Sequence, residues 1–337
     1  MLSQRNLTLY QKSILINSLL LSKVWYLAHT LPLNVKRSQE INSCIFRYLW
    51  KGMYQPIRKS TLYLPKNEGG LGVISVYNKA TSILCSTCLR AIINDVGFSN
   101  YYSKIRLSYL IKTNDIEEVS YTSPPPYSIA IDIIRQMHHH QKFPLLKSRD
   151  IYQHIFHKCV PIIEDNYPLF KWKSIWKRVN NTFIGISERE FLFRCLHETL
   201  ATNQRLQMLK IRDNGNCDKC GEVEYSLHIF YFCKNIQCVV KWFQNILIKL
   251  GNMSSSQFLR TLMLDFKASD RKYDNMITLL ISDYLYVLWL SRKKEYNTDQ
   301  TLNFLKNKFN YSRWITKCLL KDNMNAYFPN AYVNYIF

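Results

Sequence analysis

Four residues of types that bind metal ions lie close together in the second half of the chain. Their spacing is C-x2-C-x7-H-x4-C, formed by Cys217, Cys220, His228 and Cys233. Three thiolates and one imidazole complete the tetrahedral shell that zinc prefers in structural sites, and they leave no position open for a catalytic water. The sequence therefore predicts one structural Zn²⁺ ion in a small CCHC knuckle, residues 213–236, which fixes how the local chain folds.

Gly221 follows the second cysteine of this cluster, where the chain must turn tightly around the ion. A glycine tolerates the backbone conformation that points amide groups at the cysteine sulfurs. We expect His228 and Cys233 to come from the start of a short helix. Cys238 is a possible substitute ligand, but its spacing is poorer. The alternative interpretation is four unrelated reduced residues, and the spacing favours zinc over it.

The chain contains 10 cysteines, and its first residues lack the layout of a signal peptide. Disulfides are rare in reducing compartments. We therefore expect free thiols in an intracellular protein of the nucleus or cytoplasm that is not secreted. Cys85 and Cys88 lie in a predicted helix without a second ligand pair nearby, and we interpret them as core thiols.

Two further groups of histidines give weak metal signals. The three histidines of 138–140 follow a short helical pattern, and we interpret them as a solvated polar tract. His154 and His157 have helical spacing, and Cys159 is close to them. For these residues too, we favour a structural role in the fold over metal binding.

The strongest compositional signal is the charge. Lysine and arginine total 45 while aspartate and glutamate total 24, so the formal net charge is +21. Such an excess attracts polyanions and favours a nucleic-acid partner, RNA and possibly DNA, over an ordinary solvated surface. An anionic membrane surface would also attract it. However, polar residues interrupt the apolar stretch 14–31, which falls short of a spanning helix, so we expect no membrane partner.

Lysines and arginines flank the predicted zinc site on both sides. As a cluster they could neutralise phosphates, whereas each one alone is weak evidence. Aromatic side chains in the knuckle could stack on unpaired bases, although Phe230 and Phe232 suit the core of a small zinc fold equally well. The candidate stacking residues are Tyr225, Phe230, Tyr231 and Phe232. The candidate phosphate contacts are Lys171, Lys173, Lys177, Arg178, Arg205, Lys210, Arg212, Lys219, Lys234 and Lys241.

The chain has only 9 glycines and 10 prolines and is 47% hydrophobic, so the predicted fold is mainly α. Apolar residues recur at helical spacing through most of it. Thr61–Pro65 is expected to be extended, three glycines within 69–72 predict a tight turn, and Ser187 with Glu190 matches a capping box. The predicted helices span 6–31, 35–50, 75–94, 187–195, 202–211, 236–250, 271–294 and 299–321, with an apolar helical stripe at 172–179.

Residues 98–127 indicate a boundary, because they mix polar residues with the stiff extended spacer Ser123–Pro126. We therefore expect three regions. A helical bundle occupies 1–97, a connector with helices occupies 98–165, and a carboxy-terminal helical domain that contains the zinc knuckle occupies 166–337.

Several separated segments carry a resemblance to one known family. They are 17–26 (NSLLLSKVWY), 31–33 (LPL), 46–52 (FRYLWKG), 62–66 (LYLPK), 69–72 (GGLG), 200–206 (LATNQRL), the cluster 217–233 and 289–292 (WLSR). In order and spacing, the chain resembles the carboxy-terminal part of LINE-type (non-LTR retrotransposon) reverse transcriptases, with insect jockey-like elements as the nearest type. The resemblance covers nearly the whole chain.

The resemblance implies that 1–97 is a thumb-like bundle that grips a template–primer duplex. It also implies a zinc-binding domain that contacts RNA or target DNA during target-primed reverse transcription. The family's aromatic-x-Asp-Asp motif, which holds catalytic metal ions, is absent, and the sequence contains no Asp-Asp pair. We therefore expect no enzyme activity and no small-molecule substrate, and we expect a truncated copy or remnant of a longer polyprotein.

Two functional hypotheses remain open at this stage. In the first, the chain is a non-catalytic nucleic-acid-binding module with a structural zinc ion. In the second, it is a mobile-element remnant whose exposed thumb helices pair with a reverse-transcriptase partner chain or with a second copy of themselves.

Overall fold

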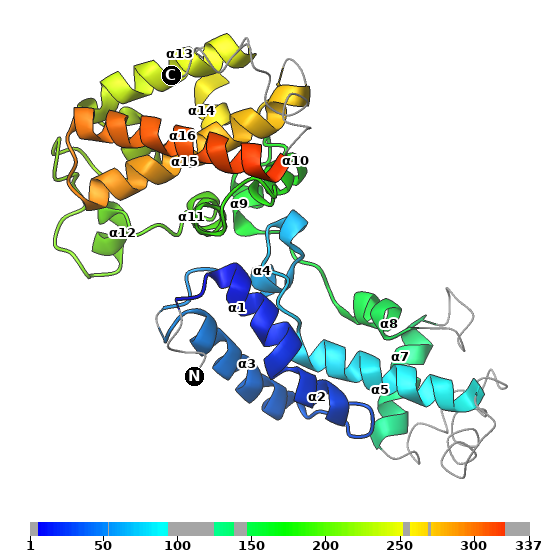
Figure 1. Ribbon diagram of the computed structural model, residues 1–337. Coiled ribbons are helices and arrows are strands. Elements are labelled where there is room, and N and C mark those ends of the chain that lie inside the picture. The colour runs from blue at the N-terminus through cyan, green and yellow to red at the C-terminus, as the bar shows by residue number, and fades with distance from the viewer. Residues whose placement is uncertain are drawn as a thin grey trace. The chain divides into compact units, whose positions relative to one another are not determined.

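The computed structural model describes residues 6–52, 54–93, 125–137, 147–251, 257–268 and 271–320 (Figure 1). Within these ranges the chain is helical and contains no strand; one isolated antiparallel bridge joins Asn216 and Val223. The predicted mainly α fold is therefore confirmed. In the same ranges, no helix combines the length and apolarity needed to cross a membrane.

The chain divides into two compact units. Unit 1 comprises Met1–Pro65 and Gly70–Cys159, and unit 2 comprises Lys66–Gly69 and Val160–Phe337. The boundary at Cys159 falls inside the expected connector 98–165. Much of that connector, including the three histidines of 138–140, lies outside the described residues.

Unit 1 begins with three helical segments where one continuous helix over 6–31 was predicted. These are α1 (Leu9–Leu15), the π-helical segment η2 (Ile16–Leu20) and α2 (Ser22–Leu27). Thr8 and Gln11 form a capping box at the start of α1. The side-chain amide of Asn17, within η2, makes two hydrogen bonds. Its Nδ2 donates to the Gly72 carbonyl (2.8 Å), and its Oδ1 accepts from the backbone amide of Ile74 (3.1 Å). These two contacts hold Asn17 against the glycine turn at the point where the regular α-helix is interrupted.

The next helix, α3 (Val35–Leu49), matches its prediction closely. The side chain of Asn34 caps its first turn, and Ile45, Phe46 and Leu49 are buried. Gly52, with a φ of 78°, donates to the Arg47 carbonyl (2.8 Å) and ends the helix, as expected for a carboxy-terminal cap.

The expectation of an extended Thr61–Pro65 is wrong. Most of this segment belongs to the short helix α4 (Lys59–Tyr63), and only Leu64 returns to an extended backbone conformation before the proline. Tertiary burial decides the outcome, because the Leu62 side chain is fully buried and its carbonyl accepts from the amides of Leu71 and Val73. Strand preference is weak evidence where such packing competes with it.

The glycine turn at 69–72 is confirmed. Gly69 and Gly72 have φ values of 80° and 67°, in the left-handed region that favours glycine. At Gly70, a Cβ atom would overlap the carbonyl oxygen of Leu64. This turn therefore requires glycine for two reasons, backbone conformation and close approach.

One hydrophobic cluster of unit 1 lies where α5 (Val76–Ile93) packs against α7 (Pro125–Met137) and α8 (Ser148–Ile155). Cys85 and Cys88 are buried in it, and burial raises the pKa of the Cys85 thiol to about 12. Both cysteines are therefore neutral core thiols, as the sequence predicted.

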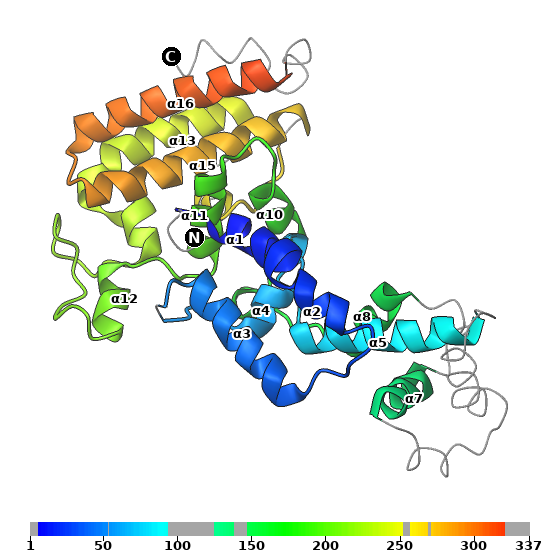
Figure 2. The same cartoon turned by 60° about the horizontal axis from the view of Figure 1, so that its bottom comes forward.

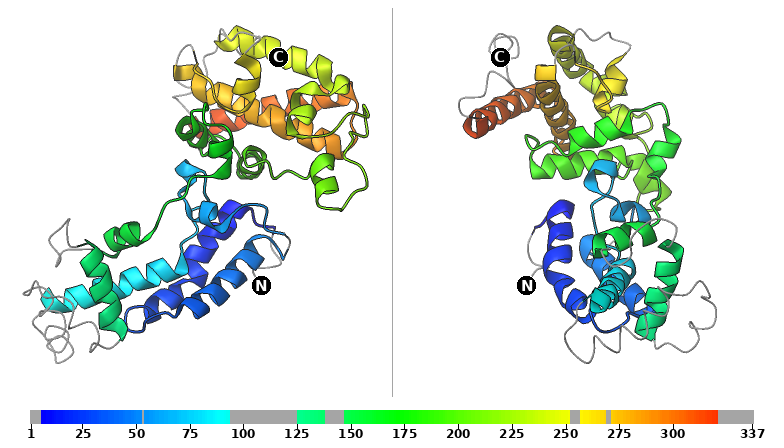
Figure 3. Two further views of the ribbon diagram at one scale, coloured as in Figure 1. Left: turned by 180° about the vertical axis from the view of Figure 1, so that it is seen from behind. Right: turned by 90° about the vertical axis from the view of Figure 1, so that its right-hand side faces the viewer.

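Unit 2 is a helical domain whose longest helices lie along one another (Figure 2). Aromatic rings join them, since Phe243 stacks on Tyr284 (centroids 4.1 Å apart) and also contacts Phe309. Its helices are α9 (Ile162–Asn166), α10 (Trp172–Val179), α11 (Ile186–Leu196), α12 (Asn203–Met208), α13 (Gln237–Gly251), α14 (Phe258–Leu262), α15 (Arg271–Lys293) and α16 (Thr298–Leu320), shown from two further sides in Figure 3. The predicted apolar stripe on α10 is buried.

The predicted capping box at Ser187 and Glu190 is wrong. Helix α11 starts at Ile186 with Gly185 as its N-cap, two residues before Ser187, and it has no side-chain cap. Glu190 instead pairs with Arg194 (2.6 Å). The Glu188 carboxylate lies where a Cβ on Gly185 would be, so the glycine leaves room for it. A long-range contact sets this arrangement, because Lys308 of α16 binds the same carboxylate (2.6 Å).

Helix α12 begins as predicted, because the Thr202 side chain accepts from the Arg205 amide and caps the first turn. It ends at Met208, before the predicted end at 211. Lys210 has a φ of 56°, which is incompatible with further helix.

Candidate metal centre

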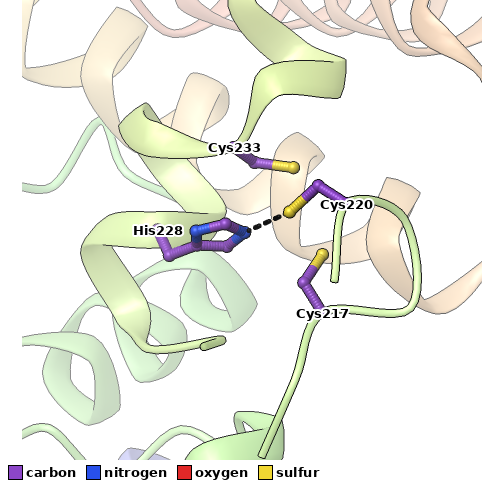
Figure 4. A group of neighbouring side chains, drawn as sticks. All are labelled: Cys217, Cys220, His228 and Cys233. Atoms are coloured by element: carbon purple, nitrogen blue, oxygen red, sulfur yellow. Dashed lines mark hydrogen bonds between the residues drawn. The ribbon is translucent and has the colours of Figure 1, made fainter. Parts of the chain in front are cut away.

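The four residues of the C-x2-C-x7-H-x4-C pattern come together in unit 2 (Figure 4). One ligand atom from each of Cys217, Cys220, His228 and Cys233 lies within 4.8 Å of all the others, and the Cys220 Sγ is 3.3 Å from the His228 Nε2. This group could hold one metal ion. Among the described residues it is the only such group, and Cys238 is exposed and outside it.

A tight turn positions the first two cysteines. The Cys217 amide donates to the Glu222 carbonyl (2.7 Å), and the Gly221 amide donates to the Cys217 carbonyl (2.9 Å). Gly221 has a φ of 78°, so a glycine is required at this place. The backbone amides of Lys219 and Cys220 lower the pKa of the Cys217 thiol against the larger effect of burial, which raises it. Such amides stabilise a thiolate, which is the form that binds a metal ion.

The second pair is positioned by the π-helical segment η5 (His228–Phe232). The Cys233 amide donates to the His228 carbonyl (2.9 Å), so the wide turn closes between the two ligands. Figure 4 shows the imidazole and the Cys233 sulfur directed at the sulfurs of the first pair. The expected short helix is present in π-helical form, but only His228 lies at its start, because Cys233 follows its last residue.

Burial sets the protonation of the metal-free group. Burial raises the pKa of the Cys217 thiol and raises that of Cys233 to about 12, while it lowers the pKa of the His228 imidazole. All three side chains are therefore neutral near pH 7 when no ion is bound. An incoming cation would displace the thiol protons, so that binding would depend on pH.

A buried polar network holds the cluster against the rest of unit 2. Arg292 of α15 donates through Nη2 to Glu224 Oε1 (2.6 Å) and to Asn203 Oδ1 (2.8 Å). The Asn203 amide donates to Glu224 Oε1 (2.8 Å), and its side chain donates to the Asn216 carbonyl (2.7 Å). Since Asn216 directly precedes Cys217, this network links α12, α15 and the turn that carries the first two cysteines.

The connection between α15 and α16 supports the other side of the turn. Lys219 Nζ donates to the Tyr296 carbonyl (2.5 Å), and Asn235 donates to the Lys219 carbonyl (2.7 Å). Thr298 in turn donates to the Asn235 carbonyl (2.9 Å). A cavity of about 350 Å³ lies beside the cluster and is lined by Cys217, His228 and Cys233 together with residues of α15 and α16.

The aromatic residues of the knuckle divide into two groups. Phe230 is buried, and its carbonyl accepts from the Tyr284 hydroxyl (2.8 Å), so it belongs to the core. Tyr231 packs on Phe258. Tyr225 and Phe232 are exposed. Of these four aromatic residues, only Tyr225 and Phe232 are exposed enough to stack on a partner.

The predicted phosphate contacts also divide by their surroundings. The Arg178 guanidinium is already engaged within unit 2, because it pairs with Asp274 (2.6 Å) and donates to the carbonyls of Leu264 and Phe266. Four others have partners inside the unit: Arg205 with the Glu198 carbonyl, Arg212 with Asp218, Lys219 with the Tyr296 carbonyl and Lys234 with Glu222. The remaining five are solvent-exposed: Lys171, Lys173, Lys177, Lys210 and Lys241.

Sequence reasoning missed the supporting role of Asn203, Glu224 and Arg292. The one available signal was Glu224, an acidic residue inside a compact knuckle, where a buried carboxylate requires a partner. The identity of that partner, 68 positions away, has no local signal.

Comparisons with known proteins leave the family open. No known family matches the chain, and no curated protein matches it.

Proposed function

We propose that this chain is a non-catalytic nucleic-acid-binding part of a LINE-type reverse transcriptase, built around one structural zinc ion. The observation that carries the proposal is the closed group of three cysteines and one histidine within 4.8 Å of one another, in a chain of net charge +21. RNA is the expected ligand, and DNA is a possible one.

Zinc suits the donor set better than other common ions. Thiolate and imidazole donors favour zinc, whereas magnesium and calcium take oxygen ligands. Four protein ligands close the tetrahedral shell, so the ion folds the knuckle and supplies no chemistry. The backbone amides at the Cys217 sulfur support the same assignment.

The charge supports a nucleic-acid partner. Five of the predicted phosphate contacts are solvent-exposed lysines, which remain available to a polyanion. Exposed aromatic side chains, Tyr225 and Phe232, lie next to the metal ligands and can stack on unpaired bases. The absence of an Asp-Asp pair from the sequence supports a role without polymerase chemistry.

The test measures zinc content and RNA binding on the same preparations. Wild type should contain one zinc per chain and should bind RNA with an affinity that falls steeply as salt rises. Cys220→Ser should lose both zinc and binding. Cys238→Ser is the matched control, because Cys238 is exposed and outside the group, and it should retain both. Wild type without zinc, or with affinity that is flat in salt, overturns the proposal.

A second candidate function rests on exposed apolar side chains in the first helices of unit 1. Soluble proteins rarely expose large contiguous apolar surfaces unless a partner covers them. The partner would be a polymerase chain or a second copy. The exposed residues of α1, η2, α2 and the following turn are Ile14, Leu19, Leu20, Tyr26, Leu27 and Leu31.

Sedimentation analysis over a range of concentrations tests this second candidate. Wild type should self-associate or sediment with an added polymerase chain, and Leu19→Lys should shift it toward the monomer. Leu169→Lys, at an exposed leucine of unit 2, is the control and should behave as wild type. A wild type that is monomeric and shows no binding to the polymerase removes this candidate.

A further inference from the structure

One face of helix α16 packs in the core of unit 2. Leu305 and Phe309 are buried on this face, together with the small polar residues Thr301, Ser312 and Thr316. Phe309 contacts Trp242 and Phe243 of α13, and Figure 2 shows α16 lying along α13 and α15. The spacing of these buried positions is helical, so the residues between them form a separate outer face.

The outer face of α16 has an unusual composition. It contains three asparagines, one lysine and two large aromatic residues: Asn303, Lys306, Asn307, Asn310, Tyr311 and Trp314, all of them exposed. A solvated helix face is ordinarily rich in charged residues of both signs. Amides and aromatic rings in their place are groups that hydrogen-bond and stack on planar, polar ligands.

The two aromatic rings form a platform. Tyr311 is 54% exposed and Trp314 is 61% exposed. Their ring centroids lie 6.2 Å apart with an angle of 30° between the planes, and Lys308 Nζ lies 5.5 Å from the Tyr311 centroid. Leaving two such rings in water forgoes the free energy of their burial, which a stacking ligand would recover.

The charge of the helix indicates which ligand fits. From Gln300 to Leu320 the sequence contains no aspartate or glutamate but contains Lys306, Lys308, Arg313 and Lys317. Lys308 is engaged with Glu188, whereas Lys306 is exposed on the outer face. A polyanion with planar bases complements this combination, and a positively charged or purely apolar partner does not.

We propose that the outer face of α16 is a binding platform for single-stranded nucleic acid. Unpaired bases stack on Tyr311 and Trp314, Lys306 contacts a phosphate, and the amides of Asn307 and Asn310 reach base edges. A duplex fits less well, because its bases are already stacked on each other. This inference rests on the proposed nucleic-acid function and assigns it a second surface, away from the metal ligands in sequence.

The experiment uses the full chain and two labelled probes, an unstructured oligouridine and a blunt RNA duplex, with fluorescence anisotropy as the readout. Loss of one stacked base costs about 1–3 kcal/mol, or roughly 5-fold to 150-fold in affinity, so Tyr311→Ala with Trp314→Ala should weaken oligouridine binding by at least roughly 5-fold. The duplex affinity should change little. Trp314→Phe should bind nearly as wild type, since it retains an aromatic face, and Tyr54→Ala, at an exposed tyrosine of unit 1, should bind as wild type.

Zinc content measured on each variant shows that unit 2 remains folded. The inference is overturned if the double variant binds oligouridine as wild type does, or if it loses both probes equally. If wild type binds neither probe, the proposed function fails and this inference fails with it.

Discussion

Arg292 places its guanidinium 2.6 Å from the Glu224 carboxylate, and this pair joins α15 to the turn that carries the candidate metal ligands. Glu224 is almost completely buried, and the same guanidinium also reaches Asn203. A buried charge without its partner is costly, because the remaining group has lost its hydration.

Glu224→Gln should therefore destabilise unit 2 by about 3–5 kcal/mol, as expected when one member of a buried ion pair is removed. Chemical denaturation followed by circular dichroism measures the change. Arg37→Gln is the control, because Arg37 and Glu40 form an exposed pair whose loss should cost less than about 1 kcal/mol. Equal effects of the two variants would show that the Arg292 pair adds no special stability.

The pH dependence of stability should carry a signature of Asp283. Burial in the helical core raises the pKa of its carboxyl from 3.8 to about 7, although Lys308 Nζ lies 3.6 Å away. Between these two pH values the folded protein holds a proton that the unfolded chain has released. Stability should therefore decrease as the pH rises from about 4 to about 7, by on the order of 2–4 kcal/mol.

Asp283→Asn should flatten this decrease, because an amide stays neutral throughout the range. Urea denaturation at a series of pH values measures it, with Asp299→Asn, an exposed residue of the same helix pair, as the control. Parallel stability curves for wild type and Asp283→Asn would contradict the assignment.

Thiol reactivity should separate the cysteines by burial. Exposed Cys44 and Cys238 should react with a maleimide within minutes in the native protein. Cys85 and Cys195 should resist it, because both are buried and burial raises the pKa of each thiol to about 12. Mass spectrometry of digested, time-quenched samples identifies the labelled positions. Rapid native labelling of Cys85 would be inconsistent with a core thiol.

Gly70→Ala should destabilise unit 1 by about 1–3 kcal/mol, because its new Cβ overlaps the Leu64 carbonyl and the chain must shift to relieve the clash. Gly52→Ala tests the effect of conformation alone, since Gly52 has a positive φ but open space around its Cβ position. It should cost about 1 kcal/mol. Thermal melts of both variants give the comparison, and a Gly70→Ala melt above that of Gly52→Ala would refute the steric argument.

Local sequence patterns predicted much of the fold and the candidate site. The helix α3, the glycine turn at 69–72 and the start of α12 at Thr202 follow from signals within a few residues. The extended Thr61–Pro65 and the capping box at Ser187 failed, and both failed for one reason. Burial of Leu62 in the first case, and the Lys308–Glu188 ion pair in the second, override the local preference.

The sequence by itself determined the candidate metal-binding group and the helical character of the chain, because both depend on residues that are close together in sequence. Tertiary structure decided which charged residues remain available. Arg178 is predicted as a phosphate contact from sequence, yet it is committed to Asp274, and Arg292 supports the metal turn through Glu224. These partners lie far apart along the chain, so only folding brings them within hydrogen-bond distance and determines which cations still face the solvent.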